Sequence, residues 1–142
     1  MRDEASIDRG FEGAVSARTI ACRVLVVDDD PEVRAALHDM LADYGFDVVG
    51  LAEDGLVGVA AAHELRPDVV LMDIRMPGKN GIDATREILA EVPGVRVIAL
   101  SAYDDPALAA AAASAGARAY IVKGTAPELI CDRIEEVRRS SA

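Results

Sequence analysis

The sequence is poor in basic residues, in cysteines and in long apolar runs, and each shortage excludes a class of protein. Its 142 residues hold 15 Lys and Arg against 25 Asp and Glu. The resulting net charge of −10 would repel a phosphate backbone, so we expect no direct nucleic-acid binding. No apolar stretch approaches the roughly 20 residues that span a bilayer, so we expect no membrane segment. The two cysteines, Cys22 and Cys131, lack the spacing of a metal or redox site.

The N-terminus also lacks the features of a secretory signal peptide. Acidic residues stand where such a peptide has a basic start followed by an apolar run. Residues 1–20 show no sustained periodicity, and we interpret them as a loosely ordered tail. The remaining residues, 21–142, have the length of one domain, and the composition is typical of globular proteins. We therefore expect a cytoplasmic single-domain protein with reduced thiols.

Short apolar runs alternate with helical patterns from residue 23 onward. The runs lie at residues 24–27, 48–51, 69–72, 95–100 and 119–122, and β-branched runs of this length indicate strands buried on both faces. Helical spacing of apolar residues covers about 31–44, 56–65, 81–92, 106–115 and 127–137. Five strands alternating with five helices predict an α/β fold with a doubly wound five-stranded parallel sheet.

Helix ends and apolar helix faces are also readable in the sequence. Asp30 followed by Pro31 is typical of an N-cap and a first helical position. Residues 125–128, Thr-Ala-Pro-Glu, predict a capping box for the last helix. The expected inward face is Val33, Leu37, Met40, Leu41 and Tyr44 in the first helix, and Leu129, Ile130, Ile134 and Val137 in the last.

Polar and charged residues follow four of the five predicted strands. They are Asp28, Asp29 and Asp30 after the first strand, Asp73 after the third, Ser101 after the fourth and Lys123 after the fifth. The second strand offers only residues 53–55, which we expect to be peripheral. Because ligands of doubly wound folds bind at the carboxyl ends of the strands, these side chains should converge at one edge of the sheet. We interpret Asp30 as an N-cap and not as a ligand.

The converging carboxylates predict a site for a divalent metal and for phosphoryl transfer. Asp28, Asp29 and Asp73 cannot all stay ionised at close range without a cation, and Mg²⁺ binds carboxylate oxygens while accepting a phosphoryl oxygen as a further ligand. A carboxylate beside Mg²⁺ can attack phosphorus and form an aspartyl phosphate. Lys123 and the Ser101 hydroxyl are suited to bind the oxygens of the transferring group.

Four segments together resemble the CheY-like receiver domain of response regulators in two-component signalling. They are residues 26–31 (VVDDDP), 71–81 (LMDIRMPGKNG), 99–102 (ALSA) and 120–123 (YIVK). They occur in the family's order, and the resemblance covers residues 22 to about 139. It implies the strand order 2-1-3-4-5 and a phosphorylated aspartate with Mg²⁺, for which Mn²⁺ can substitute.

The resemblance also implies roles for individual residues. Asp73 matches the phospho-acceptor. The implied metal ligands are Asp28, Asp29, Asp73 and the backbone carbonyl of Arg75. The implied phosphoryl contacts are Ser101, Ala102 and Lys123, and the implied switch residues are Ser101 and Tyr120. One departure is Gly124, which follows Lys123 where many receivers have a proline after a cis peptide bond.

By this resemblance the chain is expected to be a single-domain response regulator. It would accept a phosphoryl group on Asp73 from a sensor histidine kinase or a phosphotransfer protein. It would catalyse only its own phosphorylation and dephosphorylation, so we do not expect an enzyme acting on a separate substrate. The signal would reach a downstream protein, or a second copy of the chain, through the face formed by the fourth helix, the fifth strand and the fifth helix.

Other functions remain open at this point. The chain could be the receiver part of a larger transcriptional regulator. A phosphatase of the haloacid-dehalogenase type also uses an aspartyl phosphate and Mg²⁺, and residues 28–30 superficially supply its Asp-x-Asp, but it leaves Asp73 without a role. A receiver that acts only as a binding module is disfavoured by the intact set of site residues. Nucleotide-binding classes are excluded, because neither G-x-x-x-x-G-K nor G-x-G-x-x-G occurs.

Overall fold

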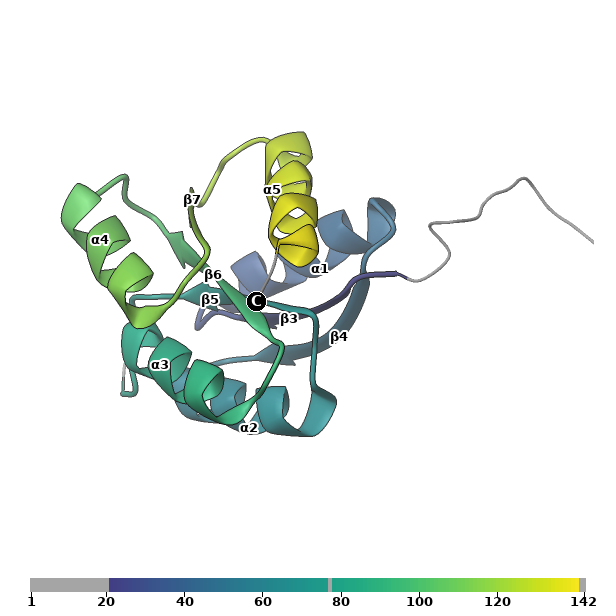
Figure 1. Cartoon of the computed structure of the whole chain (residues 1–142). Coiled ribbons are helices and arrows are strands. Elements are labelled where there is room, and N and C mark those ends of the chain that lie inside the picture. Colours follow the sequence, from purple (N-terminus) through teal and green to yellow (C-terminus); the bar gives the residue numbers. More distant parts are fainter. Residues whose placement is uncertain (1–20, 77, 141–142) are drawn as a thin grey trace, which may run out of the picture.

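The computed structural model describes residues 21–76 and 78–140, in which five strands form one sheet covered by helices (Figure 1). The strands are β3 (Arg23–Val27), β4 (Asp47–Ala52), β5 (Val69–Asp73), β6 (Arg96–Ser101) and β7 (Ala119–Val122). The helices are α1 (Pro31–Asp43), α2 (Gly55–Leu65), α3 (Gly81–Glu91), α4 (Pro106–Ala115) and α5 (Pro127–Arg139). The tail predicted for residues 1–20 lies outside the described residues.

The sheet is parallel throughout, and its strands lie in the order β4-β3-β5-β6-β7. This confirms the doubly wound α/β fold and the order 2-1-3-4-5. All five residues of β5 are buried, as expected for a central strand. The prediction of burial on both faces is wrong for β4 and β7, which are only partly buried. Both are edge strands with a neighbour on one side only, so more of their surface stays in contact with solvent.

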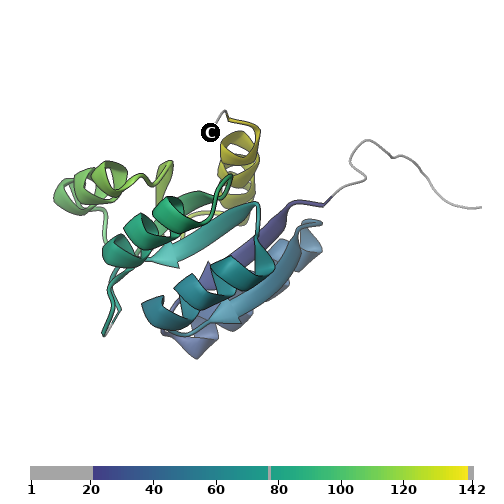
Figure 2. The same cartoon turned by 60° about the horizontal axis from the view of Figure 1, so that its bottom comes forward.

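Helices cover both faces of the sheet (Figures 1 and 2). On one face α1 and α5 pack through Leu41 and Ile134, and on the other α2 and α3 pack through Val59 and Ile88. Alternate residues of each central strand point to the two clusters, as the two-residue period of a strand requires. Near β6 and β7, α4 covers a smaller cluster. No helix in the described parts of the chain has the length and apolarity needed to cross a membrane.

Two predictions about α5 are wrong. Ala126, not Thr125, is the N-cap, because Pro127 occupies the first helical position, and its methyl side chain cannot form a cap bond. The Thr125 hydroxyl donates to the carbonyl of Val122. Leu129 is 60% exposed although an inward position was expected. Ile130, Ile134 and Val137 are buried as predicted, and Leu129 lies one residue, or about 100° around the helix, from Ile130 on that inward face.

The apolar face predicted for α1 is correct only in part. Leu41 is buried, but Tyr44 is 48% exposed. The helix ends at Asp43, so Tyr44 no longer follows the helical spacing that placed it inward, and Gly45 then adopts φ +91°.

Candidate functional site

Four polar side chains stand at the carboxyl ends of four neighbouring strands. Asp28 follows β3, Asp73 ends β5, Ser101 ends β6 and Lys123 follows β7. Strand pairing extends into the adjoining loops, because the Lys123 N–H donates to the Ser101 carbonyl at 2.7 Å and the Ile74 N–H to the Leu100 carbonyl at 3.1 Å. The parallel topology therefore brings these side chains to one edge of the sheet.

Three carboxylates form an acidic cluster at this edge. One oxygen each from Asp28, Asp29 and Asp73 lies within 4.8 Å of the other two. Asp28 is fully buried and Asp73 is 2% exposed, whereas Asp29 is exposed. One oxygen of Asp28, Oδ1, accepts from the Asp30 N–H at 2.9 Å, which orients the carboxylate. Asp30 itself accepts from the Glu32 N–H as the N-cap of α1, as predicted.

Lys123 supplies positive charge to two of these carboxylates. Its Nζ lies 2.7 Å from Oδ2 of Asp28 and 3.3 Å from Oδ2 of Asp73. Burial acts to lower the pKa of Lys123, but the two carboxylates outweigh it and the pKa is raised. The contact with Asp28 is an ion pair without hydrogen-bond alignment, so the buried Oδ2 of Asp28 has no well-directed donor.

The surroundings of Asp73 alter its ionisation. Burial raises the pKa of Asp73 to about 6, and the charge of Asp28 acts in the same direction. The Arg75 N–H, which donates to Oδ1 of Asp73 at 3.1 Å, and the Lys123 ammonium oppose this rise. Desolvation dominates here, so the site would gain from a further cation at neutral pH.

The donor set fits a hard divalent cation such as Mg²⁺. It offers three carboxylates close together, and one buried carboxylate oxygen, Oδ2 of Asp28, lacks an aligned hydrogen-bond donor. Carboxylate oxygens are the ligands that Mg²⁺ prefers. The cluster therefore has the chemistry that such an ion needs, and the Lys123 ammonium at present pairs with two of its carboxylates.

The loop after β6 connects the buried Ser101 to Tyr120 on β7. Ser101 Oγ accepts from the Tyr103 N–H at 3.1 Å, and the Tyr120 hydroxyl donates to the Tyr103 carbonyl. The Tyr120 ring packs beside Ile74, Ala99 and Ala112 under α4. Ala102, between Ser101 and Tyr103, is exposed.

Two residues of the site were missed by the sequence analysis. Arg34, one turn into α1, donates through Nη1 to the carbonyl of Asp28 at 2.7 Å, and Tyr103 contacts both Ser101 and Tyr120. The sequence could not reveal the role of Arg34, because a contact between a helix and the loop before it leaves no periodic pattern in the sequence. Tyr103 lies only two residues beyond Ser101, but its contacts depend on the position of β7, a neighbour in space.

Comparison with known proteins gives concordant matches. The family model of the response regulator receiver domain matches residues 24–135. The response regulator GacA of Pseudomonas viridiflava is 45% identical over 103 residues, which are 72% of this chain and 48% of that protein, so the chain spans about half of that relative. The chemotaxis protein CheY of Thermotoga maritima is 39% identical over 117 residues, 82% of this chain and 98% of that protein.

A solved structure agrees with these matches in fold as well as in sequence. The response regulator domain of Thermotoga maritima CheB has a TM-score of 0.79 and 33% identity to this chain, and the match covers 87% of this chain and 100% of that one. The chain belongs to the response regulator receiver domain family, the CheY-like signalling modules of two-component systems.

Proposed function

We propose that this chain accepts a phosphoryl group on Asp73 and uses it to switch a protein-interaction surface. The observation that carries the proposal is the convergence of Asp73 with Asp28, Ser101 and Lys123 at one edge of the sheet. A buried carboxylate beside a second carboxylate and an ammonium group is arranged for nucleophilic attack on phosphorus, with positive charge available to the transferred oxygens.

In the proposed reaction, an oxygen of Asp73 forms a bond to phosphorus while the bond from phosphorus to the donor's histidine nitrogen breaks. The Lys123 ammonium pairs with an oxygen of the transferred group, and the Ser101 hydroxyl and the Ala102 N–H donate to its other oxygens. Asp28, Asp29, Asp73 and the Arg75 carbonyl would hold Mg²⁺, or Mn²⁺ in its place, and the bound ion would neutralise charge on the phosphoryl oxygens. Water later hydrolyses the acyl phosphate, which regenerates the Asp73 carboxylate and releases inorganic phosphate, and the proposal includes no reaction on a separate substrate.

The proposed partners follow from this chemistry. The phosphoryl donor is a sensor histidine kinase or a phosphotransfer protein, both of which interact with receiver domains generally. The output surface is the face of α4, β7 and α5, and its partner is a downstream protein or a second copy of the chain. We place the protein in the cytoplasm, with no direct contact to nucleic acid or membrane. This assignment applies equally to a single-domain regulator and to the receiver part of a longer one.

Labelling with acetyl phosphate or a phosphohistidine donor in the presence of Mg²⁺ tests the proposal. We expect one phosphoryl group per chain in the wild type and none in Asp73→Asn. The matched control is Asp132→Asn, which changes an exposed carboxylate on α5 and should label like the wild type. Wild-type labelling of Asp73→Asn would contradict the proposal. Sustained turnover of para-nitrophenyl phosphate would instead support a phosphatase.

A further inference from the structure

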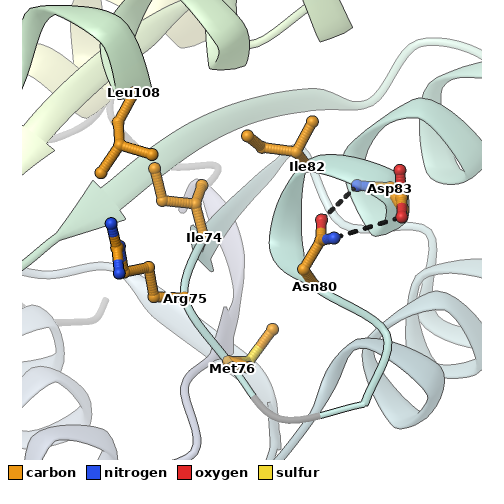
Figure 3. Close-up of a pocket in the computed structure, with 7 residues that line it drawn as sticks. All are labelled: Ile74, Arg75, Met76, Asn80, Ile82, Asp83 and Leu108. Atoms are coloured by element: carbon orange, nitrogen blue, oxygen red, sulfur yellow. Dashed lines mark hydrogen bonds between the residues drawn. The ribbon is translucent and has the colours of Figure 1, made fainter.

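The loop between β5 and α3 carries the Arg75 carbonyl that the proposed metal site uses. It leaves the sheet through Ile74, Arg75 and Met76 and returns at Asn80, the N-cap of α3 (Figure 3). The Arg75 N–H donates to Oδ1 of Asp73 at 3.1 Å, which fixes the start of the loop. One wall of the loop borders an open groove of about 520 Å³, so packing on that side gives the loop little support.

The end of the loop is held at Lys79 by two neighbouring helices. The ammonium Nζ pairs with Oε1 of Glu87 on α3 at 2.6 Å. The carbonyl oxygen lies against Gly55, the buried first residue of α2, because a Cβ at Gly55 would stand only 2.4 Å from that oxygen. A carbonyl oxygen is favourable at the amino end of a helix, since the first N–H groups lack intrahelical partners and carry partial positive charge. The backbone of the loop therefore packs directly on the first turn of α2.

This close approach requires glycine at position 55. The nearest atoms to an added Cβ include the carbonyl oxygen and the carbonyl carbon of Lys79, at 2.4 and 3.2 Å, and no side-chain rotation can move them. Gly55 has no positive φ, so the requirement comes from space and not from backbone conformation. A larger residue would have to displace either the Lys79 carbonyl, and the loop with it, or the start of α2.

We propose that Gly55 is a positioning residue for the metal site. It lets the loop after β5 pack on α2, and so holds the Arg75 carbonyl where it can join the three carboxylates as a ligand of the ion. Gly55 itself touches neither the ion nor the phosphoryl group. Residues 53–55, which we expected to be peripheral, thus support the site from a second element. This inference rests on the proposed function, which supplies the Arg75 carbonyl as a ligand.

Titration with Mg²⁺ in the absence of a phosphoryl donor tests the proposal. Amide NMR shifts give the Kd of the folded protein for the wild type and for each variant. Gly55→Ala should raise this Kd about tenfold or more, the usual loss when a group that orients a metal ligand is disturbed. The matched control is Gly50→Ala, whose added Cβ meets only the Cδ1 atoms of Leu65 and Leu25, at 2.7 and 3.2 Å. These side-chain ends can move, so the control should retain the wild-type Kd.

A second pair of variants tests the support from α2 without adding an atom at Gly55. The Asp54 side chain accepts from the Val57 N–H at 2.8 Å and so caps the first turn of α2. Asp54→Asn removes the charge but keeps a capping side chain, whereas Asp54→Ala removes both. Because only the second change loosens the turn, Asp54→Ala should raise the Kd for Mg²⁺ more than Asp54→Asn does. Thermal melts check that each variant is folded, and where Gly55→Ala is not, the Asp54 pair decides.

The outcomes separate this inference from the proposed function. A wild-type Kd in folded Gly55→Ala, or equal Kd values in the two Asp54 variants, would overturn the positioning role and leave the proposed function intact. An equal loss of affinity in Gly50→Ala and Gly55→Ala would also overturn it, because any tight contact would then have the same effect. A wild type that binds no Mg²⁺ would overturn the metal site of the proposed function and the positioning role with it.

Discussion

At Asp73, burial of the side chain opposes its ionisation. Its pKa of about 6 lies above the ordinary 3.8 of an aspartate because the carboxyl is removed from water and lies near Asp28. The Lys123 ammonium relieves only part of this cost, although it contacts both carboxylates. The charged Asp73 carboxylate therefore destabilises the folded protein, and binding a cation or forming a bond to a phosphoryl group would relieve this cost.

A stability prediction follows for the metal-free protein. The folded-state pKa is raised, so the group's favourable contribution is fully present below about pH 4 and is lost as the pH rises through about 6. At pH 8 with a chelator, Asp73→Asn should therefore be more stable than the wild type by about 2–3 kcal/mol, or about 6–10 °C in Tm. The difference should shrink at pH 4.5. Thermal melts at both pH values measure it.

The control for that measurement is Asp132→Asn, whose side chain is exposed on α5. It should shift the Tm little at either pH, because a surface charge contributes little to stability. If Asp73→Asn melted below the wild type at pH 8, the Asp73 carboxylate would be stabilising when charged, and the account of its environment would be wrong.

At the scale of elements, the close approach of α3 to β5 sets the position of Asp73. A Cβ at Gly81, the first residue of α3, would lie 2.1 Å from the Asp73 carbonyl oxygen and 2.5 Å from the Ile74 Cα. Both contacts are to backbone atoms, so neither can be relieved by a side-chain rotation. Only glycine allows the helix to begin so close to the strand that ends in Asp73.

Gly81→Ala should therefore cost about 2 kcal/mol or more and also slow the labelling of Asp73. The control is Gly124→Ala, where nothing lies within 4 Å of the added Cβ. Gly124 has φ +91°, so this change should cost only the strain of a left-handed residue, about 1–2 kcal/mol, with less effect on labelling. Urea unfolding compares the two. Equal labelling rates in the two variants would show that Gly81 does not position the acceptor.

The orientation of α5 gives a second prediction at this scale. Ile130 is buried beside Ile134 and Val137, whereas Leu129 is 60% exposed. Ile130→Ala should destabilise the protein by about 2–4 kcal/mol, and Leu129→Ala by about 0.5 kcal/mol or less. Urea unfolding of the two variants checks this, and a larger loss for Leu129→Ala would mean that the helix presents a different face to the sheet.

The sequence was sufficient for the elements because their signals are local. Each β-branched run became a strand, and Asp30 and Pro31 mark the start of α1 as predicted. It was insufficient where a contact depends on tertiary structure. The exposure of Leu129 depends on how α5 is rotated against the sheet, and the contact of Tyr103 with Tyr120 depends on the position of β7. The contact of Arg34 with the Asp28 carbonyl is local, but no periodic pattern in the sequence indicates it.

At the scale of the whole molecule, a chain of contacts leads from Ser101, at the carboxyl edge of the sheet, to the face of α4 and β7. Ser101 Oγ accepts a hydrogen bond from the Tyr103 N–H, and the Tyr103 carbonyl accepts one from the Tyr120 hydroxyl. Tyr120 lies on β7 and packs beside Ala112 of α4. A movement of the Ser101 hydroxyl toward a phosphoryl group would remove the first of these contacts, and a shift of a few kcal/mol is enough to change which conformation dominates.

Ser101→Ala should therefore keep phosphorylation at Asp73 but uncouple it from the distant face. We expect beryllofluoride with Mg²⁺ to change the amide NMR shifts of wild-type residues 105–116 and of Tyr120. In Ser101→Ala the shift changes should remain in the loop that follows Asp73 and should not extend to the face of α4 and β7. Equal changes at residues 105–116 in the two proteins would show that the signal takes another route.

The central claim, that Asp73 carries the phosphoryl group, is tested most directly by chemical trapping. Borohydride reduces an aspartyl phosphate to homoserine, so the modified position can be read by peptide mass spectrometry after labelling with acetyl phosphate and Mg²⁺. The account predicts homoserine in place of Asp73 and unmodified aspartate at Asp28 and Asp29. Homoserine at position 28 or 29, with Asp73 unchanged, would contradict it.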